Sequence, residues 1–311
     1  MLSTNGAMQP ALPHRYRAYG LAIDSALPLP ELFAEDAAEN DADIAITLGT
    51  VPEAGPDTAQ RIGPFVWATP EQFWLCIPGI ARFRIAAGQK IVIDRDQAGD
   101  MDGIRAFLLG TALGVLLAQR RHLMLHGNAI RVGEGCVVCV GPSGMGKSTL
   151  AAGFHRRGFP LLTDDLVMVD DHRCVTPGLP RIKLWADTTQ ALAIDTAPLR
   201  RIRPKLEKFS YPVPAGFADT VMPVHAVYTL AITNGDIVTI EPLAGFAKFN
   251  EVRSNIYRPQ FVEAMGQRSL YLSLCARLAA DIRVARIARP ARGFTVDRVI
   301  DTILDDLRAT R

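Results

Sequence analysis

The sequence has few of the features that mark secreted, membrane-spanning or nucleic-acid-binding proteins. It contains 5 cysteines among 311 residues, and 34 Lys and Arg against 32 Asp and Glu leave a net charge of +2. Its longest apolar stretch, residues 104–118, is shorter than the roughly 18 residues needed to cross a bilayer, and no basic segment leads into an apolar signal sequence near the N-terminus. We therefore expect reduced cysteines, a core helix at 104–118 and a cytoplasmic protein that binds neither membrane nor nucleic acid.

The chain does contain enough apolar material for a folded core. Hydrophobic residues make up 49% of the sequence and charged residues 21%, a balance that argues against a disordered chain, and the length suggests two domains. Charge divides the two parts, because residues 1–100 carry 7 basic and 13 acidic side chains whereas residues 101–311 carry 27 and 19. A phosphate-bearing ligand is therefore expected to bind in the second part.

The first hundred residues consist of short β-forming segments separated by Pro and Gly turns. This pattern predicts a small, mainly antiparallel β-rich domain over residues 1–100. An acidic stretch within it, residues 31–43, is expected to form a mobile loop. The expected strands are 16–23, 44–48, 73–77, 81–85 and 91–93.

From residue 101 onward the pattern changes to strands that alternate with helical segments, which predicts an α/β layer in a second domain over residues 101–311. Farther on, Asn234-Gly235-Asp236 between two apolar runs predicts a β-hairpin. The expected strands are 123–125, 136–140, 161–169, 227–232 and 237–240, and the expected helices are 103–120, 147–157, 244–256, 259–280 and 295–309.

A glycine-rich motif lies inside this α/β pattern. The segment Gly141-Pro142-Ser143-Gly144-Met145-Gly146-Lys147-Ser148 matches G-x-x-x-x-G-K-[ST], and it follows a β-forming run and precedes a helical pattern, as a phosphate-binding loop does. Glycines let backbone N–H groups turn toward phosphate oxygens, and the following helix adds its partial positive charge. In this pattern Lys147 reaches the β- and γ-phosphates of ATP, and Ser148 binds Mg²⁺. Thr149, the next residue, is expected to belong to the same nucleotide site. The motif alone does not distinguish a kinase from an ATPase or a GTPase.

Polar side chains near this motif help to choose between a kinase, an ATPase and a GTPase. Asp164 and Asp165 lie between apolar runs shortly after the motif, which favours one carboxylate near Mg²⁺ and the other near an acceptor hydroxyl, with a plain turn as the alternative. His126 ends a short apolar run and is either a packing residue or part of the site. The segment 200–209 holds five basic residues. It is either a solvated face or a group that closes over the nucleotide or binds an acidic substrate.

In their order and spacing, His126-Gly127, the loop 141–149 and the Asp164-Asp165 pair resemble the catalytic domain of HPr kinase/phosphatase, a bacterial serine kinase. The resemblance covers residues 120–310 and is sharp over 123–170. It implies a P-loop α/β kinase fold after the β-rich domain, ATP and Mg²⁺ as cofactors, and a serine of a peptide or small protein as acceptor. The roles it implies are phosphate binding by Lys147, Lys183 and Lys208, Mg²⁺ binding by Ser148 and Asp164, proton abstraction by Asp165, and assistance near the transferred phosphate by His126.

The sequence also departs from that family. Arg181 stands where the family has a metal-binding Glu, and the family's Pro-Gly-Arg-Asn loop, which is associated with dephosphorylation, has no counterpart near 223–225. We therefore expect a kinase without phosphatase activity. The N-terminal part, through 19–32 and 108–114, is similar instead to a branch of HPr-kinase-like proteins in which some members phosphorylate the C-terminal serine of a lasso-peptide precursor.

The leading hypothesis is thus an ATP–Mg²⁺-dependent serine kinase acting on a peptide or small protein such as a lasso-peptide precursor. Three alternatives stay open: a kinase of HPr itself, a non-enzymatic ATP-binding regulator, and an enzyme that phosphorylates a small molecule or only hydrolyses nucleotide. The family's hexamer suggests a homo-oligomer. No segment that would read a particular base is visible in the sequence.

Overall fold

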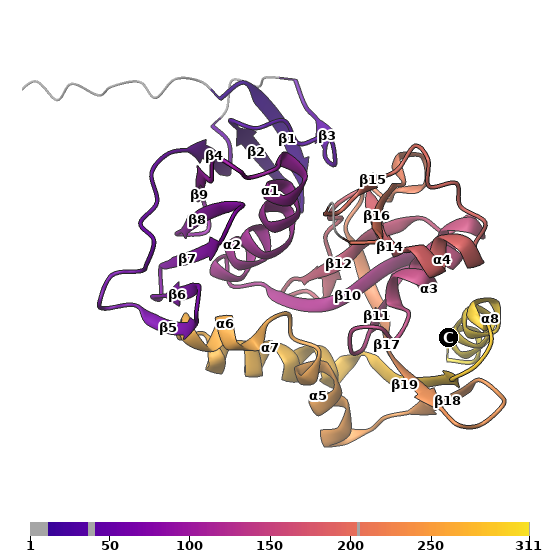
Figure 1. The fold of residues 1–311 in the computed structure, drawn as a ribbon. Helices are drawn as coiled ribbons and strands as arrows, with labels where there is room; N and C mark the ends of the chain where they lie inside the picture. The colour runs from indigo at the N-terminus through magenta and orange to yellow at the C-terminus, as the bar shows by residue number, and fades with distance from the viewer. Residues whose placement is uncertain (1–11, 37–40, 204–205, 311) are drawn as a thin grey trace, which may run out of the picture.

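The computed structural model describes residues 12–36, 41–203 and 206–310. Part of the predicted mobile loop, residues 37–40, lies outside this range. The described chain forms a mixed α/β fold with one sheet in its N-terminal part and two sheets farther on (Figure 1).

The N-terminal sheet has the strand order β3-β1-β2-β4-β9-β8-β7-β6-β5. Its neighbours pair antiparallel except at β2–β4 and β4–β9, which are parallel. Alternation places Phe73, Phe83 and Ile85 fully inside, because successive side chains of a strand point to opposite faces. The strands are β1 (His14–Ala18), β2 (Leu21–Ser25), β3 (Phe33–Ala34), β4 (Ile44–Leu48), β5 (Gln60–Gly63), β6 (Val66–Ala68), β7 (Gln72–Ile77), β8 (Ala81–Ala86) and β9 (Lys90–Arg95).

A continuous helical stretch follows this sheet, formed by α1 (Met101–Phe107), the π-helical turn η1 (Leu108–Ala112) and α2 (Leu113–Gln119). By length and composition alone it could cross a membrane, but 78% of its most apolar window is buried inside the molecule. It packs between the N-terminal sheet and strand β10 (Leu123–Val132) (Figure 1). The expected core helix is therefore present, and it joins the two parts of the chain through one hydrophobic core.

The second sheet supports the glycine-rich loop. Its order is β11-β10-β12-β13-β17-β19-β18, and an additional pairing of β11 with β17 closes part of it into a ring. The strand β11 before the loop pairs with β10 on one edge and with β17 on the other, and it is buried along its whole length. Besides β10, the strands are β11 (Gly135–Val140), β12 (Leu161–Val169), β13 (Cys174–Val175), β17 (Met222–Thr233), β18 (Thr239–Pro242) and β19 (Arg283–Pro290).

A small third sheet and several helices surround this ring. The sheet has the order β14-β16-β15, and helix α3 packs against α8 and β14. Helix α6 reaches back to the N-terminal sheet, where Phe261 lies 4.8 Å from Phe73 between ring centroids. The elements are α3 (Lys147–Arg156), β14 (Arg181–Trp185), α4 (Ala186–Ala191), β15 (Arg200–Arg201), β16 (Lys208–Pro212), η2 (Pro214–Gly216), α5 (Gly245–Ser254), α6 (Pro259–Ala264), α7 (Arg268–Asp281) and α8 (Val296–Ala309).

Two expectations for the C-terminal part are wrong. The strands at 227–232 and 237–240 do not form a hairpin, because β18 pairs with β19 and β17 runs parallel to β19. The helix expected over 259–280 is interrupted at Gly266, whose φ of 71° is left-handed and ends a helix readily. The strand β19 was not expected from the sequence, because its arginines recur at every third position, 283, 286 and 289, and so lack the two-residue alternation of a strand.

Glu31 connects the N-terminal part to the rest of the molecule. Its carboxylate oxygen Oε1 lies 3.1 Å from Nε of Arg105 on α1 and 3.8 Å from Nη1 of Arg181 on β14. The three side chains are 12%, 8% and 4% exposed. Two buried guanidinium groups therefore share one buried carboxylate at this junction.

Candidate functional site

The glycine-rich loop connects β11 to α3 and is held close to the sheet. Gly141 has a φ of 137°, and a Cβ atom at this position would lie 2.9 Å from the backbone oxygen of Leu230 on β17. Gly146, with a φ of 96°, is the N-cap of α3. Only glycine adopts these conformations without strain, so the loop approaches the sheet closely and points the start of α3 at the cavity.

Lys147 is the first residue of α3, and its ammonium group lies inside the loop. Its Nζ donates hydrogen bonds to the carbonyl oxygens of Gly141 at 2.7 Å and Pro142 at 3.0 Å. The residue is 8% exposed, and burial lowers its pKa. Asn128 on β10 donates to the Lys147 carbonyl at 2.7 Å and so fixes the start of the helix.

Ser148 and Asp164 form an oxygen-rich pair beside Lys147. The Ser148 hydroxyl donates to the two Asp164 carboxylate oxygens at 3.1 and 3.2 Å, and the Lys183 backbone N–H donates to Asp164 at 2.9 Å. Burial and the neighbouring Asp165 raise the pKa of Asp164 to about 6. A cation next to this carboxylate would favour its ionised form.

Asp165 belongs to the same strand, β12, and lines the same cavity as Asp164. Adjacent strand residues ordinarily point to opposite faces, but Asp165 has a φ of 80°. This left-handed conformation, which Asp tolerates better than most residues, explains how both carboxylates reach one site. Non-glycine residues in this region often mark functional sites.

The Asp165 carboxylate contacts Lys183 and His126. Lys183 Nζ lies 2.6 Å from its Oδ2, and His126 Nδ1 lies 3.1 Å from the Asp165 carbonyl oxygen and 3.4 Å from Oδ1. Burial alone would raise the pKa of Asp165, but the Lys183 ammonium outweighs it and holds that pKa well below its usual range. Burial also lowers the pKa of His126, so its imidazole is neutral at pH 7. Because a carbonyl only accepts, Nδ1 carries the proton and Nε2 stays a proton acceptor.

Replacing Lys183 by Met is expected to cost about 1.5–3 kcal/mol of unfolding free energy at pH 7, because it removes a hydrogen bond to a charged group. An Asp with a lowered pKa stabilises the native state fully above about pH 4, the ordinary range of its pKa, and loses this effect as the pH falls further. The stability difference between wild type and Lys183→Met should therefore shrink toward pH 3. Thermal unfolding between pH 7 and pH 3 measures it, with Lys248→Met on α5 as control. A difference that does not change with pH would contradict the ion pair.

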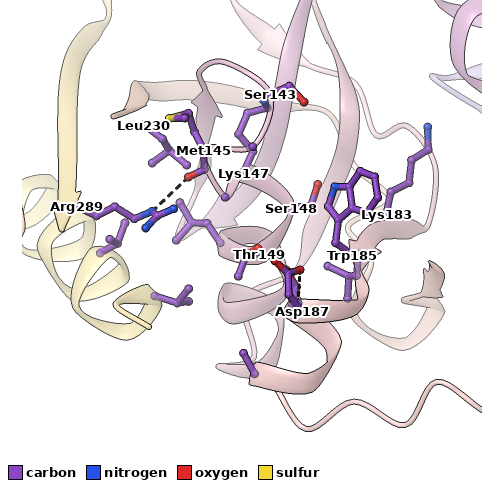
Figure 2. Close-up of a pocket in the computed structure, with 18 of the residues that line it drawn as sticks. Ser143, Met145, Lys147, Ser148, Thr149, Lys183, Trp185, Asp187, Leu230 and Arg289 are labelled. Atoms are coloured by element: carbon purple, nitrogen blue, oxygen red, sulfur yellow. Dashed lines mark hydrogen bonds between the residues drawn. The ribbon is translucent and has the colours of Figure 1, made fainter. Parts of the chain in front are cut away.

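These side chains line a cavity of about 590 Å³ (Figure 2). Met145, Leu230 and Arg289 lie on one side of it and Trp185 and Lys183 on the other. The cavity collects the predicted site residues from separate elements, which are His126, Ser143, Gly144, Met145, Gly146, Lys147, Ser148, Thr149, Asp164, Asp165, Lys183 and Lys208. Gly141 and Pro142 line a second cavity instead.

Several lining residues were not predicted from the sequence. Arg289 donates to the Met145 carbonyl at 3.4 Å from the end of β19, and Thr188 on α4 shares a hydrogen bond of 2.9 Å with Thr149. Both are distant from the motif in sequence, and no local pattern marks them. Asn128, which fixes the start of α3 through its hydrogen bond to the Lys147 carbonyl, could have been found from the sequence, because it lies two residues after His126 on a strand and so shares its face.

Arg181 lies near Glu31 and does not line this cavity. In the HPr kinase/phosphatase family, which the sequence resembles, a metal-binding Glu stands at this position. Among the residues that the structure describes, no group of three or more His, Cys, Asp or Glu side chains could hold a metal ion. The Ser148–Asp164 pair still fits Mg²⁺ bound together with nucleotide phosphates, because Mg²⁺ takes oxygen ligands and usually keeps only one or two from the protein.

Comparison with known proteins finds similarity to solved structures. No family model matches the chain, and no curated protein matches it. The chain is similar to the solved structure of the HPr(Ser) kinase/phosphatase from Coxiella burnetii, at 13% identity, over 60% of this chain and 91% of that one, with a TM-score of 0.31. A similarity at this level does not assign a function, so the residues of the site carry the proposal below.

Proposed function

We propose that the protein is an ATP- and Mg²⁺-dependent kinase that transfers the γ-phosphoryl group to a serine hydroxyl of a peptide or small protein. The observation that carries this proposal is the position of Asp165. Its carboxylate lies beside the glycine-rich loop, within reach of His126 and Lys183, at the point where two cavities meet. Hydrolysis of ATP needs only a nucleotide cavity and water, whereas transfer needs a second cavity for an acceptor.

In the proposed reaction the acceptor oxygen attacks the γ-phosphorus in line with the bond that breaks. A bond forms between the acceptor oxygen and phosphorus, the bond from phosphorus to the β–γ bridging oxygen breaks, and ADP leaves. The acceptor proton passes to the Asp165 carboxylate. Lys147 and the N–H groups of the loop bind the β- and γ-phosphates throughout.

Lys183 links nucleotide binding to the availability of Asp165. In this structure its ammonium group is paired with Asp165 at 2.6 Å, which makes the carboxylate a weak base. The γ-phosphate gives the ammonium group a second anion to bind, so ATP would free Asp165 from its ion pair and raise its pKa. Lys208 lines the same cavity and would bind phosphate as well.

Ser148 and Asp164 are the residues that would hold Mg²⁺. When bound, the ion neutralises part of the charge on the β- and γ-phosphate oxygens. The Asp164 carboxylate now accepts a hydrogen bond from the Ser148 hydroxyl at 3.1 and 3.2 Å. With Mg²⁺ bound, this carboxylate would face the cation instead of the hydroxyl. The lone pairs of the Ser148 hydroxyl, which its hydrogen bond to Asp164 does not use, would face the same ion.

For the acceptor we propose a serine at or near the end of a peptide, as in a lasso-peptide precursor. This finer assignment rests on the resemblance of the N-terminal segments. Phosphoryl transfer from radiolabelled ATP to a Ser-ending precursor peptide and to HPr, measured side by side, distinguishes the two acceptors. ATP binding without any labelled acceptor would indicate a regulator, and release of phosphate that no peptide stimulates would indicate a nucleotide hydrolase.

Lys147→Met is expected to weaken ATP binding about 10- to 100-fold, because it removes charge-assisted hydrogen bonds to phosphate oxygens. Transfer should fall by about 10²- to 10³-fold, the usual effect of losing one preorganised donor. Titration with a fluorescent ATP analogue measures the first and single-turnover transfer the second. Lys248→Met is the matched control. If the Lys147→Met variant bound ATP with unchanged affinity, the assignment of the loop as the nucleotide-binding site would be contradicted.

A further inference from the structure

A second cavity of about 650 Å³ adjoins the first one at the site. It shares His126, Asp165 and Lys183 with the first cavity. It is also lined by Gly141 and Pro142, whose carbonyls bind the Lys147 ammonium group. The two cavities therefore meet at the proposed base, where the proposed reaction places the γ-phosphate. An acceptor in the second cavity would reach this point without entering the nucleotide cavity.

The walls of this cavity come from three distant parts of the chain. The end of α1 and the turn η1 contribute Phe107 and Thr111, the basic segment after β15 contributes Arg203, and the segment between α5 and α6 contributes Tyr257 and Arg258. Because α1 and η1 also pack on the N-terminal sheet, the N-terminal part of the chain helps to shape this cavity.

Two exposed arginines, Arg203 and Arg258, line this cavity. Arg203 Cζ lies 5.4 Å from the Phe107 ring centroid, and Arg258 Cζ lies 5.6 Å from the Tyr257 centroid and 5.3 Å from that of Phe261. Arg258 Nε also donates to the Tyr257 hydroxyl at 3.2 Å. Within the described part of the chain, no carboxylate forms an ion pair with either arginine.

Among the described residues, Glu251 is the other carboxylate residue besides Asp165 that lines this cavity, and it is already paired. Glu251 accepts from Arg286 Nη2 at 2.8 Å. The remaining charge of the cavity wall is thus positive, from Arg203 and Arg258. Their aromatic contacts hold the guanidinium planes while leaving N–H donors for a ligand, and such planar donors match the two oxygens of a carboxylate.

We propose that the second cavity binds the phosphate acceptor and that Arg203 and Arg258 bind a carboxylate of the acceptor next to the hydroxyl that is phosphorylated. This inference rests on the proposed function and adds the recognition chemistry. The carboxylate is either the α-carboxylate at a chain end or an acidic side chain beside the serine. Both place one negative charge close to the hydroxyl, and both are ligands for the same arginines.

Three synthetic peptides test the proposal on the full chain with Mg²⁺ and a non-hydrolysable ATP analogue. They are Gly-Ala-Gly-Ala-Gly-Ser with a free carboxylate, the same peptide as its C-terminal amide, and Gly-Ala-Gly-Ala-Asp-Ser as the amide. Binding is measured by calorimetry, and phosphorylation with ATP is measured by mass spectrometry. At least one carboxylate-bearing peptide is expected to bind about 10-fold or more tightly than the neutral amide, which is the size of one hydrogen bond to a charged group. The peptide that binds identifies the source of the carboxylate.

Arginine variants supply the second half of the test. Arg203→Gln and Arg258→Gln should each weaken that binding about 10-fold, while the affinity for the ATP analogue stays within about twofold and thermal unfolding is unchanged. Arg277→Gln on α7, whose side chain is 54% exposed, is the matched control and should change neither binding constant. Equal binding of the neutral amide, no binding of any peptide, or normal binding to both arginine variants would overturn the proposal.

The outcomes also separate this inference from the proposed function. Arginine-dependent binding of a carboxylate peptide without phosphorylation would support the cavity assignment and contradict a kinase. Phosphorylation of all three peptides at equal rates would support a kinase and contradict the carboxylate site.

Discussion

Asp165→Asn is expected to lower the rate of phosphoryl transfer by about 10²- to 10⁴-fold, the usual contribution of a general base. Asparagine has nearly the same shape, so the left-handed backbone at this position, with its φ of 80°, is retained. It cannot take a proton from the acceptor, and it no longer pairs with the Lys183 ammonium group. Rapid-quench measurements of a single turnover report the chemical step directly.

Binding of ATP should survive this substitution. The loop, Lys147 and the Ser148–Asp164 pair are untouched, and loss of the Asp165 charge leaves Lys183 free for phosphate. We therefore expect the affinity for ATP to stay equal or to rise. Asp171→Asn, a carboxylate that is 70% exposed and pairs with Arg277, is the control. Transfer at the wild-type rate in Asp165→Asn would show that another group takes the proton, and neutral His126 with its free Nε2 would be that group.

Glu31→Ala is expected to lower the free energy of unfolding by about 3–5 kcal/mol, the usual cost of removing one partner of a buried ion pair. The carboxylate is the only charged partner of Arg181 among the described residues within 4.0 Å. Arg181 is 4% exposed, and its Nε and Nη2 atoms have no hydrogen-bond partner in the described structure. Without Glu31 its charge would be buried and unpaired. Urea unfolding followed by circular dichroism measures the change.

Glu53→Ala provides the matched control for Glu31. Glu53 is 88% exposed and lies 3.5 Å from Arg82, and an exposed pair of this kind is worth about 0–1 kcal/mol. A loss below about 1 kcal/mol in Glu31→Ala would mean that Arg181 finds other partners. In that case the junction would not depend on this carboxylate.

The glycine-rich loop and its flanking strand and helix could be predicted because their signals are local. Gly141 and Gly146 adopt conformations that favour glycine, and Lys147 begins the helix as the motif implies. The Asp164-Asp165 pair was expected near the loop because two adjacent carboxylates follow the motif between apolar runs, whereas a site role for His126 was expected from the resemblance to a family. All three residues line the first cavity. The chemistry of these residues stays a prediction until transfer is measured.

The pairing of the strands, and the cavity-lining residues that lie far from the glycine-rich motif in sequence, could not be predicted from the sequence. Asn234-Gly235-Asp236 does separate two strands, but β18 pairs with β19, which follows after α5, α6 and α7, and not with β17. Hairpin signals describe only neighbouring residues, whereas the register of β17 on β11 and β19 depends on the folded core. Arg203, Arg258 and Arg289 reach the two cavities in the same non-local way.

The pairing of β11 with both β10 and β17 has a consequence for the order of folding. β11 and β10 are neighbours in sequence, but Val140 pairs with Thr229 on β17, which requires closure of a long segment of chain. Contacts of this length form slowly and late. Gly141 rests directly on β17, so we expect the loop to reach its final shape only after that closure. Nucleotide binding would then report completion of the fold, and nascent chains that end before β17 would not bind ATP.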